Sequence, residues 1–145
     1  MKFETFDPSI AEMIVASHAN VGGLPAYLGV QLDELGPGTL RASLAVRDDL
    51  VTPVGAMHGG VMAALVDHVL GVVLYPLMKR GQWAATTEFK LNYLAAVKKG
   101  RLEARSQVLS FGRRSAVVRC EVSNEGRVVC AAQGTLLISE PPASS

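Results

Sequence analysis

The feature that most constrains the fold of this chain is a run of apolar residues from Val61 to Leu77, with Asp67 and His68 near its middle. Its length approaches that of a membrane span, but an aspartate at the centre of a span costs roughly 2.5–3.5 kcal/mol. We therefore interpret residues 59–78 as one long helix, apolar almost all round and buried all round in a soluble protein. Pro76 disfavours helix at the residue before it, so the sequence does not determine the residue at which this helix ends.

Alternation of apolar and polar residues predicts strands on both sides of this helix. A hairpin that turns at residues 36–38 precedes the helix, and longer strands follow it. The expected strands are residues 30–35, 39–46, 83–95, 101–111, 115–123 and 127–139. In the last hairpin we place Glu125 at the centre of the turn. Cys120 and Cys130 are then cross-strand neighbours, and Val128 shares their apolar face.

The predicted fold class is α+β, an antiparallel sheet of five or six strands wrapped around one long central helix. A short helix over residues 8–19, with Asp7 as its N-cap, lies in an N-terminal helical segment, residues 1–28. Residues 140–145 form a loose tail, and residues 1–145 form a single domain. Because one helix covers a sheet of this length, another subunit must cover its remaining edge or face.

Charge and composition exclude several classes of partner. Fourteen basic residues nearly balance thirteen acidic ones, for a net charge of +1, so nothing favours nucleic acid or an anionic membrane surface. Two cysteines and three histidines show no metal-ligand spacing, and we predict neither a metal site nor a cofactor. The N-terminal residues lack the apolar stretch of a secretory signal, so we expect a cytoplasmic protein with free thiols.

The residues with the clearest chemical potential lie on the predicted central helix. Gly59 and Gly60 leave its first N–H groups accessible to an anion or a developing oxyanion. Asp67 lies two turns further on, where an ionised carboxylate is costly unless it is paired. Gly59 and Asp67 are eight residues apart, about 12 Å along a helix, which is too far for both to act on one carbonyl. If both serve one reaction, they come from different chains of a dimer whose helices are antiparallel.

Structural explanations stay open for each of these residues. The glycine pair could serve close packing alone, and His58 could be a helix-terminal residue whose ring is satisfied locally. Asp67 could form a buried structural hydrogen bond. No Lys or Arg lies within a turn of Asp67, however, so a simple ion pair on the helix does not account for it.

The segment HGGVMAALVD, residues 58–67, resembles the helix motif of the PaaI-like acyl-CoA thioesterases, a branch of the hotdog superfamily. Residues 86–105 are similar to the strand and turn that follow the helix in that family, and residues 110–138 are similar to its closing hairpin. The resemblance implies a hotdog fold and hydrolysis of a thioester between coenzyme A and an acyl or aryl-acyl group. It also implies a homodimer with shared active sites, assembled into a dimer of dimers.

The resemblance implies a role for individual residues. The N–H of Gly59 polarises the thioester carbonyl, Asp67 of the other chain acts as general base or nucleophile, and Thr86 helps to place the attacking water. Thr52, seven residues before Gly59, stands where the family commonly has Asn or Gln. With His58, these residues form the candidate catalytic set.

Further residues are candidates for binding the substrate. These are Gly60 at the helix start, Met57 and Phe89 as residues that could line the pocket, and Arg113 and Arg114 as a clamp for the phosphates of coenzyme A. A solvated pair at a strand edge is the alternative explanation for the two arginines. The alternative function is a non-catalytic module of the same fold that binds or senses acyl-CoA, which the departure from the Asn or Gln pattern leaves open.

Overall fold

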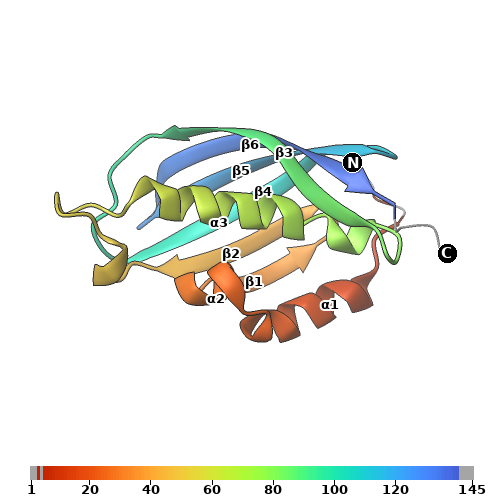
Figure 1. The fold of residues 1–145 in the computed structure, drawn as a ribbon, viewed down its shortest axis with the longest axis horizontal. Coiled ribbons are helices and arrows are strands. Elements are labelled where there is room, and N and C mark those ends of the chain that lie inside the picture. The colour runs from red at the N-terminus through yellow and green to blue at the C-terminus, as the bar shows by residue number, and fades with distance from the viewer. Residues whose placement is uncertain (1–2, 4, 141–145) are drawn as a thin grey trace.

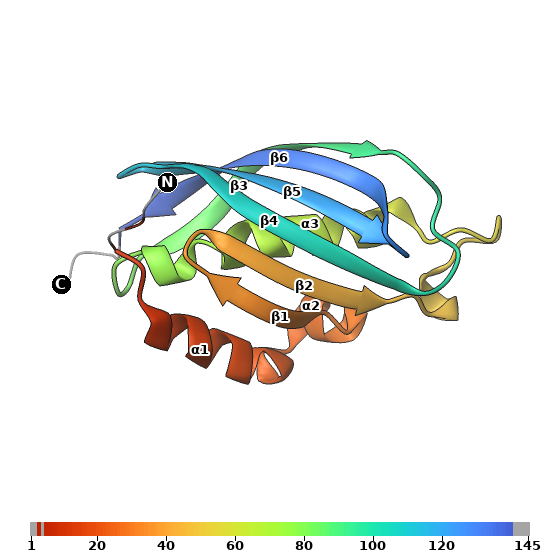
Figure 2. The same cartoon turned by 180° about the vertical axis from the view of Figure 1, so that it is seen from behind.

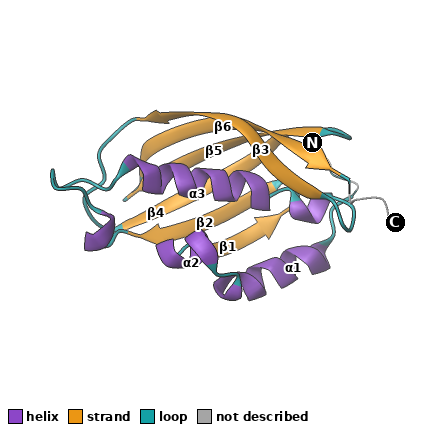
Figure 3. Cartoon of the chain, viewed as in Figure 1, coloured by secondary structure: helices purple, strands orange, loops and turns teal. Residues whose placement is uncertain are grey.

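The computed structural model describes residue 3 and residues 5–140. Within them, six strands form one antiparallel sheet in the order β1-β2-β4-β5-β6-β3, which curls around helix α3 (Figures 1 and 3). The strands are β1 (Gln31–Gly36), β2 (Thr39–Ala45), β3 (Trp83–Tyr93), β4 (Arg101–Phe111), β5 (Ser115–Asn124) and β6 (Arg127–Ser139). The helices are α1 (Pro8–Ser17), α2 (Gly23–Leu28) and α3 (Gly59–Val72), with 3-10 turns η1 (His18–Asn20), η2 (Asp48–Leu50) and η3 (Tyr75–Leu77). The predicted fold is confirmed; of the expected tail, residues 141–145 lie outside the described residues.

Helix α3 packs into the concave face of the sheet through one of its sides. The side chains on that side are almost fully buried: Val61, Met62, Leu65, Val66, Val69 and Leu70. Asp67 is exposed. The sheet of the same chain lies against only one side of this helix (Figure 1), so the other side is left uncovered. The expectation that this helix is buried all round is therefore wrong for a single chain.

The apolar run is not one continuous α-helix. Helix α3 ends at Val72, and turn η3 contains Pro76, which has no N–H with which to continue the helical ladder. Within the described residues, Gly59–Leu77 has the length and composition of a membrane span, but 56% of its apolar window is buried inside the protein. The core helix of a soluble protein has this same property, so the segment gives only weak support for a span.

The last hairpin has a different register from the one expected. Its turn is formed by residues 125 and 126, with φ angles of 51° and 79°. A β-bulge beside Val122 then shifts the pairing by one residue, so that Cys120 lies opposite Ala132 and Val122 lies opposite Cys130. The predicted pairing of Cys120 with Cys130 is therefore wrong, and both thiols are buried and free.

The same bulge changes which valine faces the core. Val129 is 2% exposed, whereas Val128 is 40% exposed. The extra residue of the bulge reverses the alternation of β6 at this point, so the side chain of Val128 points outward. The expected position of Val128 on the inner face is wrong. The inner face of β5 is buried as predicted, with Ala116, Val118, Cys120 and Val122.

The two edges of the sheet differ in how they are covered. Helix α1, whose N-cap Asp7 accepts the N–H of Ser9 at 2.9 Å, lies alongside β1 (Figures 1 and 2). Strand β3 forms the opposite edge and, among the described strands, pairs with β6 alone. Its outward row of N–H and C=O groups is therefore open to another chain.

Candidate active site

The start of helix α3 leaves one backbone donor free. The ring of His58 caps the helix, because its Nδ1 accepts the N–H of Gly60 at 2.9 Å. The N–H of Val61 donates to the carbonyl of His58 at 3.0 Å, and the N–H of His58 donates to the carbonyl of Leu50 at 2.9 Å. Among the hydrogen bonds of the described residues, none uses the N–H of Gly59. That N–H is thus the first free donor at the positive end of the helix dipole.

Both glycines at this position are needed for close packing. Neither has a positive φ, so their backbone conformation suits any residue. A Cβ on Gly60 would lie 2.9 Å from Nδ1 of His58, and a Cβ on Gly59 would lie 2.9 Å from Cζ of Tyr93. The glycine pair therefore lets the rings of Tyr93 and His58 approach the helix start.

A hollow of about 480 Å³ lies beside this helix start. Its lining includes α2, the loop before α3 and the first turn of α3: Leu24, Tyr27, Leu28, residues 49–53, His58, Gly60, Val61 and Ala64. Thr52 is in this lining, but its hydroxyl and its N–H both donate to the carbonyl of Ala56, at 2.9 and 2.8 Å. The side chain of Thr52 thus closes the loop onto itself and does not offer a free donor to the hollow.

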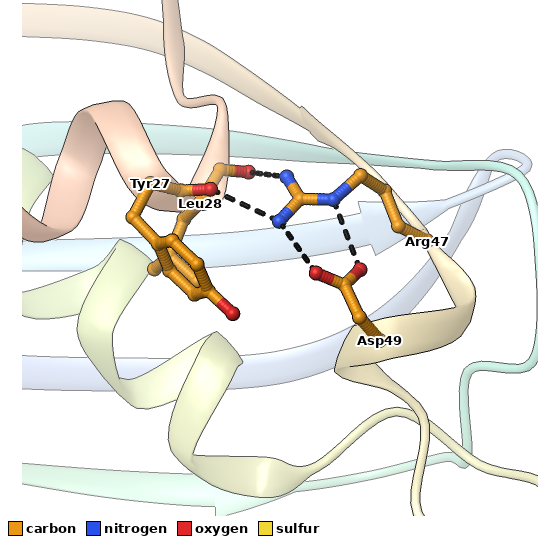
Figure 4. A network of polar contacts seen from close by, with 4 residues as sticks. All are labelled: Tyr27, Leu28, Arg47 and Asp49. Atoms are coloured by element: carbon orange, nitrogen blue, oxygen red, sulfur yellow. Dashed lines mark hydrogen bonds and ion pairs between the residues drawn. The ribbon is translucent and has the colours of Figure 1, made fainter.

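Arg47 fixes the wall of this hollow, as Figure 4 shows. Its guanidinium donates to the carbonyls of Tyr27 and Leu28, both at 2.9 Å, and pairs with Asp49 at 3.1 Å. Through this hydrogen bond it lowers the pKa of the Asp49 carboxyl. The network joins the end of α2 to η2 just before the helix start. No local pattern in the sequence predicts this network, because Leu28 and Tyr27 lie 19 and 20 residues before Arg47.

A second hollow, of about 820 Å³, contains Asp67. Its lining also includes Thr86 and Phe89 on β3, so the structure brings these three predicted residues together. A β-bulge between Thr86 and Glu88 interrupts the alternation of β3 here, and Thr86, Thr87, Glu88 and Phe89 all reach the hollow. Asp67 therefore lies on a rigid helix and opens onto a hollow with several polar groups.

Sequence reasoning missed two residues of this second hollow, His18 from η1 and His68 from α3. Their ring centroids lie 5.0 Å apart. Burial, and then the neighbouring His18, lower the pKa of His68 to about 4; burial also lowers the pKa of His18. Both rings are therefore neutral near pH 7, so neither supplies Asp67 with a positive charge. The approach of η1 to α3 depends on tertiary packing, which no motif in the sequence records.

The two hollows share no lining residue, and one chain does not bring its own Gly59 and Asp67 together. Along α3 the separation is about 12 Å. Met57 lines neither hollow; it is 5% exposed and packs in the core. Arg113 and Arg114 are exposed in the turn between β4 and β5, and they also lie outside both linings.

Comparison with known proteins identifies the class to which this fold and these hollows belong. The chain matches the family model described as the thioesterase superfamily over residues 54–131. The proofreading thioesterase EntH of Cronobacter turicensis is 31% identical over 112 residues, which cover 77% of this chain and 82% of the relative. The 1,4-dihydroxy-2-naphthoyl-CoA hydrolase of Escherichia coli is 26% identical over 118 residues, with 81% and 87% covered. The chain therefore belongs to the thioesterase superfamily.

Solved structures narrow the assignment within that superfamily. A protein from Pseudomonas aeruginosa superposes with a TM-score of 0.80 at 30% identity, covering 86% of this chain and 99% of that one. The phenylacetic acid degradation protein PaaI of Thermus thermophilus gives 0.72 at 28% identity, covering 78% and 96%. The resemblance to PaaI-like hotdog thioesterases is confirmed, and the protein is a thioester hydrolase by family.

Proposed function

We propose that this protein hydrolyses the thioester of an acyl or aryl-acyl group linked to coenzyme A, releasing the free acid and coenzyme A. One observation carries the proposal. Helix α3 has a free N–H at Gly59, whose neighbours His58 and Gly60 line the first hollow, and an exposed carboxylate at Asp67, which lines the second. A donor for an oxyanion and an acceptor for a proton are the two groups that hydrolysis of a thioester requires. The relative from Escherichia coli is named as the hydrolase of a CoA ester, which supports this substrate class.

In the proposed mechanism, the N–H of Gly59 donates to the thioester carbonyl and stabilises negative charge as it develops on the oxygen. Asp67 of the other chain takes a proton from water, and the water oxygen attacks the carbonyl carbon. The carbon–sulfur bond then breaks, and the thiolate of coenzyme A takes up the proton. Thr86, in the hollow of Asp67, holds the water. Attack by the Asp67 carboxylate itself, with hydrolysis of the resulting anhydride, is the second form of this mechanism.

The site requires two chains arranged antiparallel. Pairing of the open β3 edge with the same edge of a second copy would run the two α3 helices in opposite directions. It would also cover the side of α3 that carries Asp67, which the chain's own sheet leaves exposed. A homodimer of this kind, its assembly into a dimer of dimers and a cytoplasmic location are predictions. Arg113 and Arg114 are proposed to bind the phosphates of coenzyme A from an exposed turn, where a large anionic group has access.

A panel of acyl-CoA and aryl-acyl-CoA esters, assayed by release of free thiol, tests the proposal with wild type and Asp67→Asn. We expect the wild type to turn over at least one ester and Asp67→Asn to lose at least a hundredfold in kcat while it stays folded. Binding of CoA esters without release of thiol would instead identify the chain as a binding or sensing module. Full turnover by folded Asp67→Asn would remove the aspartate from the mechanism.

A further inference from the structure

Tyr93, the last residue of β3, holds the start of helix α3. Its hydroxyl donates to the carbonyl of Gly59 at 2.8 Å. The N–H of the same peptide unit, which belongs to Gly60, donates to Nδ1 of His58 at 2.9 Å. The peptide between the two glycines is therefore held at both ends by side chains, one from β3 and one from the helix cap.

The neighbouring peptide carries the free N–H of Gly59. Its carbonyl, from His58, accepts the N–H of Val61 at 3.0 Å. Three of the four polar groups in these two peptide units are thus occupied, and the remaining one is the proposed oxyanion donor. A preorganised donor stabilises developing charge only as far as its direction is fixed beforehand.

The ring of Tyr93 also sets the requirement for glycine at position 59. A Cβ there would lie 2.9 Å from Cζ and 3.0 Å from the hydroxyl oxygen of Tyr93, both too close. The φ of Gly59 is not positive, so the backbone itself would accept alanine. Tyr93 is 54% exposed, so burial of a large apolar surface does not account for its position on the helix start.

We propose that Tyr93 is a positioning residue that fixes the direction of the Gly59 N–H toward the thioester carbonyl. This inference rests on the proposed function, in which that N–H is the oxyanion donor. Tyr93 acts through the backbone of Gly59 by its hydroxyl, and its ring keeps this segment of α3 from shifting toward the end of β3. Tyr93 thus connects two elements: strand β3, whose edge the partner is expected to cover, and the first turn of helix α3.

Tyr93→Phe tests the hydrogen bond, because it removes the hydroxyl and keeps the ring. We expect kcat to fall by about 3- to 10-fold, as for one lost hydrogen bond to a positioned group, with KM within about twofold of wild type. Ser17→Ala is the matched control, because it removes another exposed hydroxyl that donates to a backbone carbonyl at 2.8 Å, on α1. A purely structural role would lower the melting temperature of Tyr93→Phe and leave kcat unchanged, and that result would overturn the proposal.

Gly59→Ala and Tyr93→Ala, alone and combined, test the ring contact. Alanine keeps the N–H at position 59, so Gly59→Ala does not remove the proposed donor. We expect this single variant to lose activity or stability, because its Cβ meets the ring of Tyr93. In the Tyr93→Ala background the same change should cost less than about twofold in kcat. If Gly59→Ala is as harmful without the tyrosine ring as with it, the ring does not set the glycine requirement and this part of the inference is wrong.

The same assay tests the proposed thioesterase function separately from the role of Tyr93. If the wild type releases no thiol from any ester, or Asp67→Asn keeps full turnover, the proposed function fails whatever Tyr93 does. If Asp67→Asn is inactive and Tyr93→Phe matches the wild-type kcat, the function stands and the role of Tyr93 is refuted.

Discussion

Complementation between two inactive variants tests whether the active site is shared. The perturbations are Asp67→Asn, which removes the proton acceptor, and Gly59→Pro, which removes the backbone N–H. A proline is compatible with the first position of a helix, but its Cβ would lie 2.9 Å from Cζ of Tyr93, so the folding of this variant must be checked first. Each variant alone forms dimers in which every site lacks one of the two groups.

The expected magnitude follows from the geometry of α3. Gly59 and Asp67 are about 12 Å apart along the helix. The hollow beside the helix start and the hollow that Asp67 lines have no common lining residue. A mixed dimer therefore has one site with both groups intact and one site with neither. Random exchange of subunits makes about half of the dimers mixed, each with one working site of two, so about a quarter of the wild-type activity should return.

The assay mixes the two purified variants, each with its own affinity tag, under conditions in which subunits exchange. Tandem purification isolates the mixed dimers, and thiol release from a CoA ester measures their turnover, which should reach about half of the wild-type value per dimer. Mixing Asp67→Asn with wild type is the control for exchange. Verified mixed dimers that stay inactive would refute the shared site, and Asp67 would then serve a different carbonyl donor within its own chain.

Three further predictions concern the phosphate clamp, the packing and the pH dependence. Replacing Arg113 and Arg114 by alanine should raise KM for CoA esters about tenfold and spare short thioesters without the nucleotide; equal effects on both substrates would make the pair structural. Gly134→Ala should lower Tm by about 3–10 °C in a melting experiment, because its Cβ would lie 2.7 Å from Cβ of Phe89 and 2.8 Å from a β3 carbonyl, whereas the same change at Gly112, 3.4 Å from its nearest neighbour, should be close to neutral. Burial lowers the pKa of His68 from 6.5 to about 4, so its neutral ring contributes to stability fully above pH 6.5 and loses that contribution as the pH falls toward 4. Solvent screening of the half-buried ring reduces this contribution to the free energy of unfolding to about 1–2 kcal/mol. His68→Phe should therefore flatten the dependence of the free energy of unfolding on pH between about 4 and 6.5. An unchanged slope in this variant would show that His68 is not the group responsible.

The sequence predicted the elements of the fold well where a local pattern was sufficient. The apolar run gave α3, and period-two alternation gave all six strands of the described sheet. The register of the last hairpin was wrong by two residues: the turn takes both residue 125 and residue 126, and the bulge beside Val122 adds one more residue, which alternation alone does not reveal. The end of α3 at Val72 follows from Pro76, which the sequence had already marked as a point of doubt.

The candidate site was predictable only in part. Gly59 and Asp67 stood out because a free helix start and an isolated carboxylate are conspicuous on an apolar helix. His18, His68 and Tyr93 were missed, since each reaches its position through packing between elements that are distant in sequence. The exposure of Asp67 was also missed, because periodicity does not show that the chain's own sheet covers only one side of the helix.

These observations together explain why one protomer is an incomplete enzyme in the proposed mechanism. Strand β3 carries Thr86 to the hollow of Asp67 and Tyr93 to the start of α3, so this single edge strand supports both of the separated groups. In the proposed dimer, edge pairing about a two-fold axis would order both halves of the site in the same event, since the strand proposed to form the interface is also the strand proposed to position the donor and the water. Because α1 already lies along the β1 edge, the β3 edge is the one left to form this contact. In this proposal, catalysis and assembly would be coupled through the same eleven residues of β3.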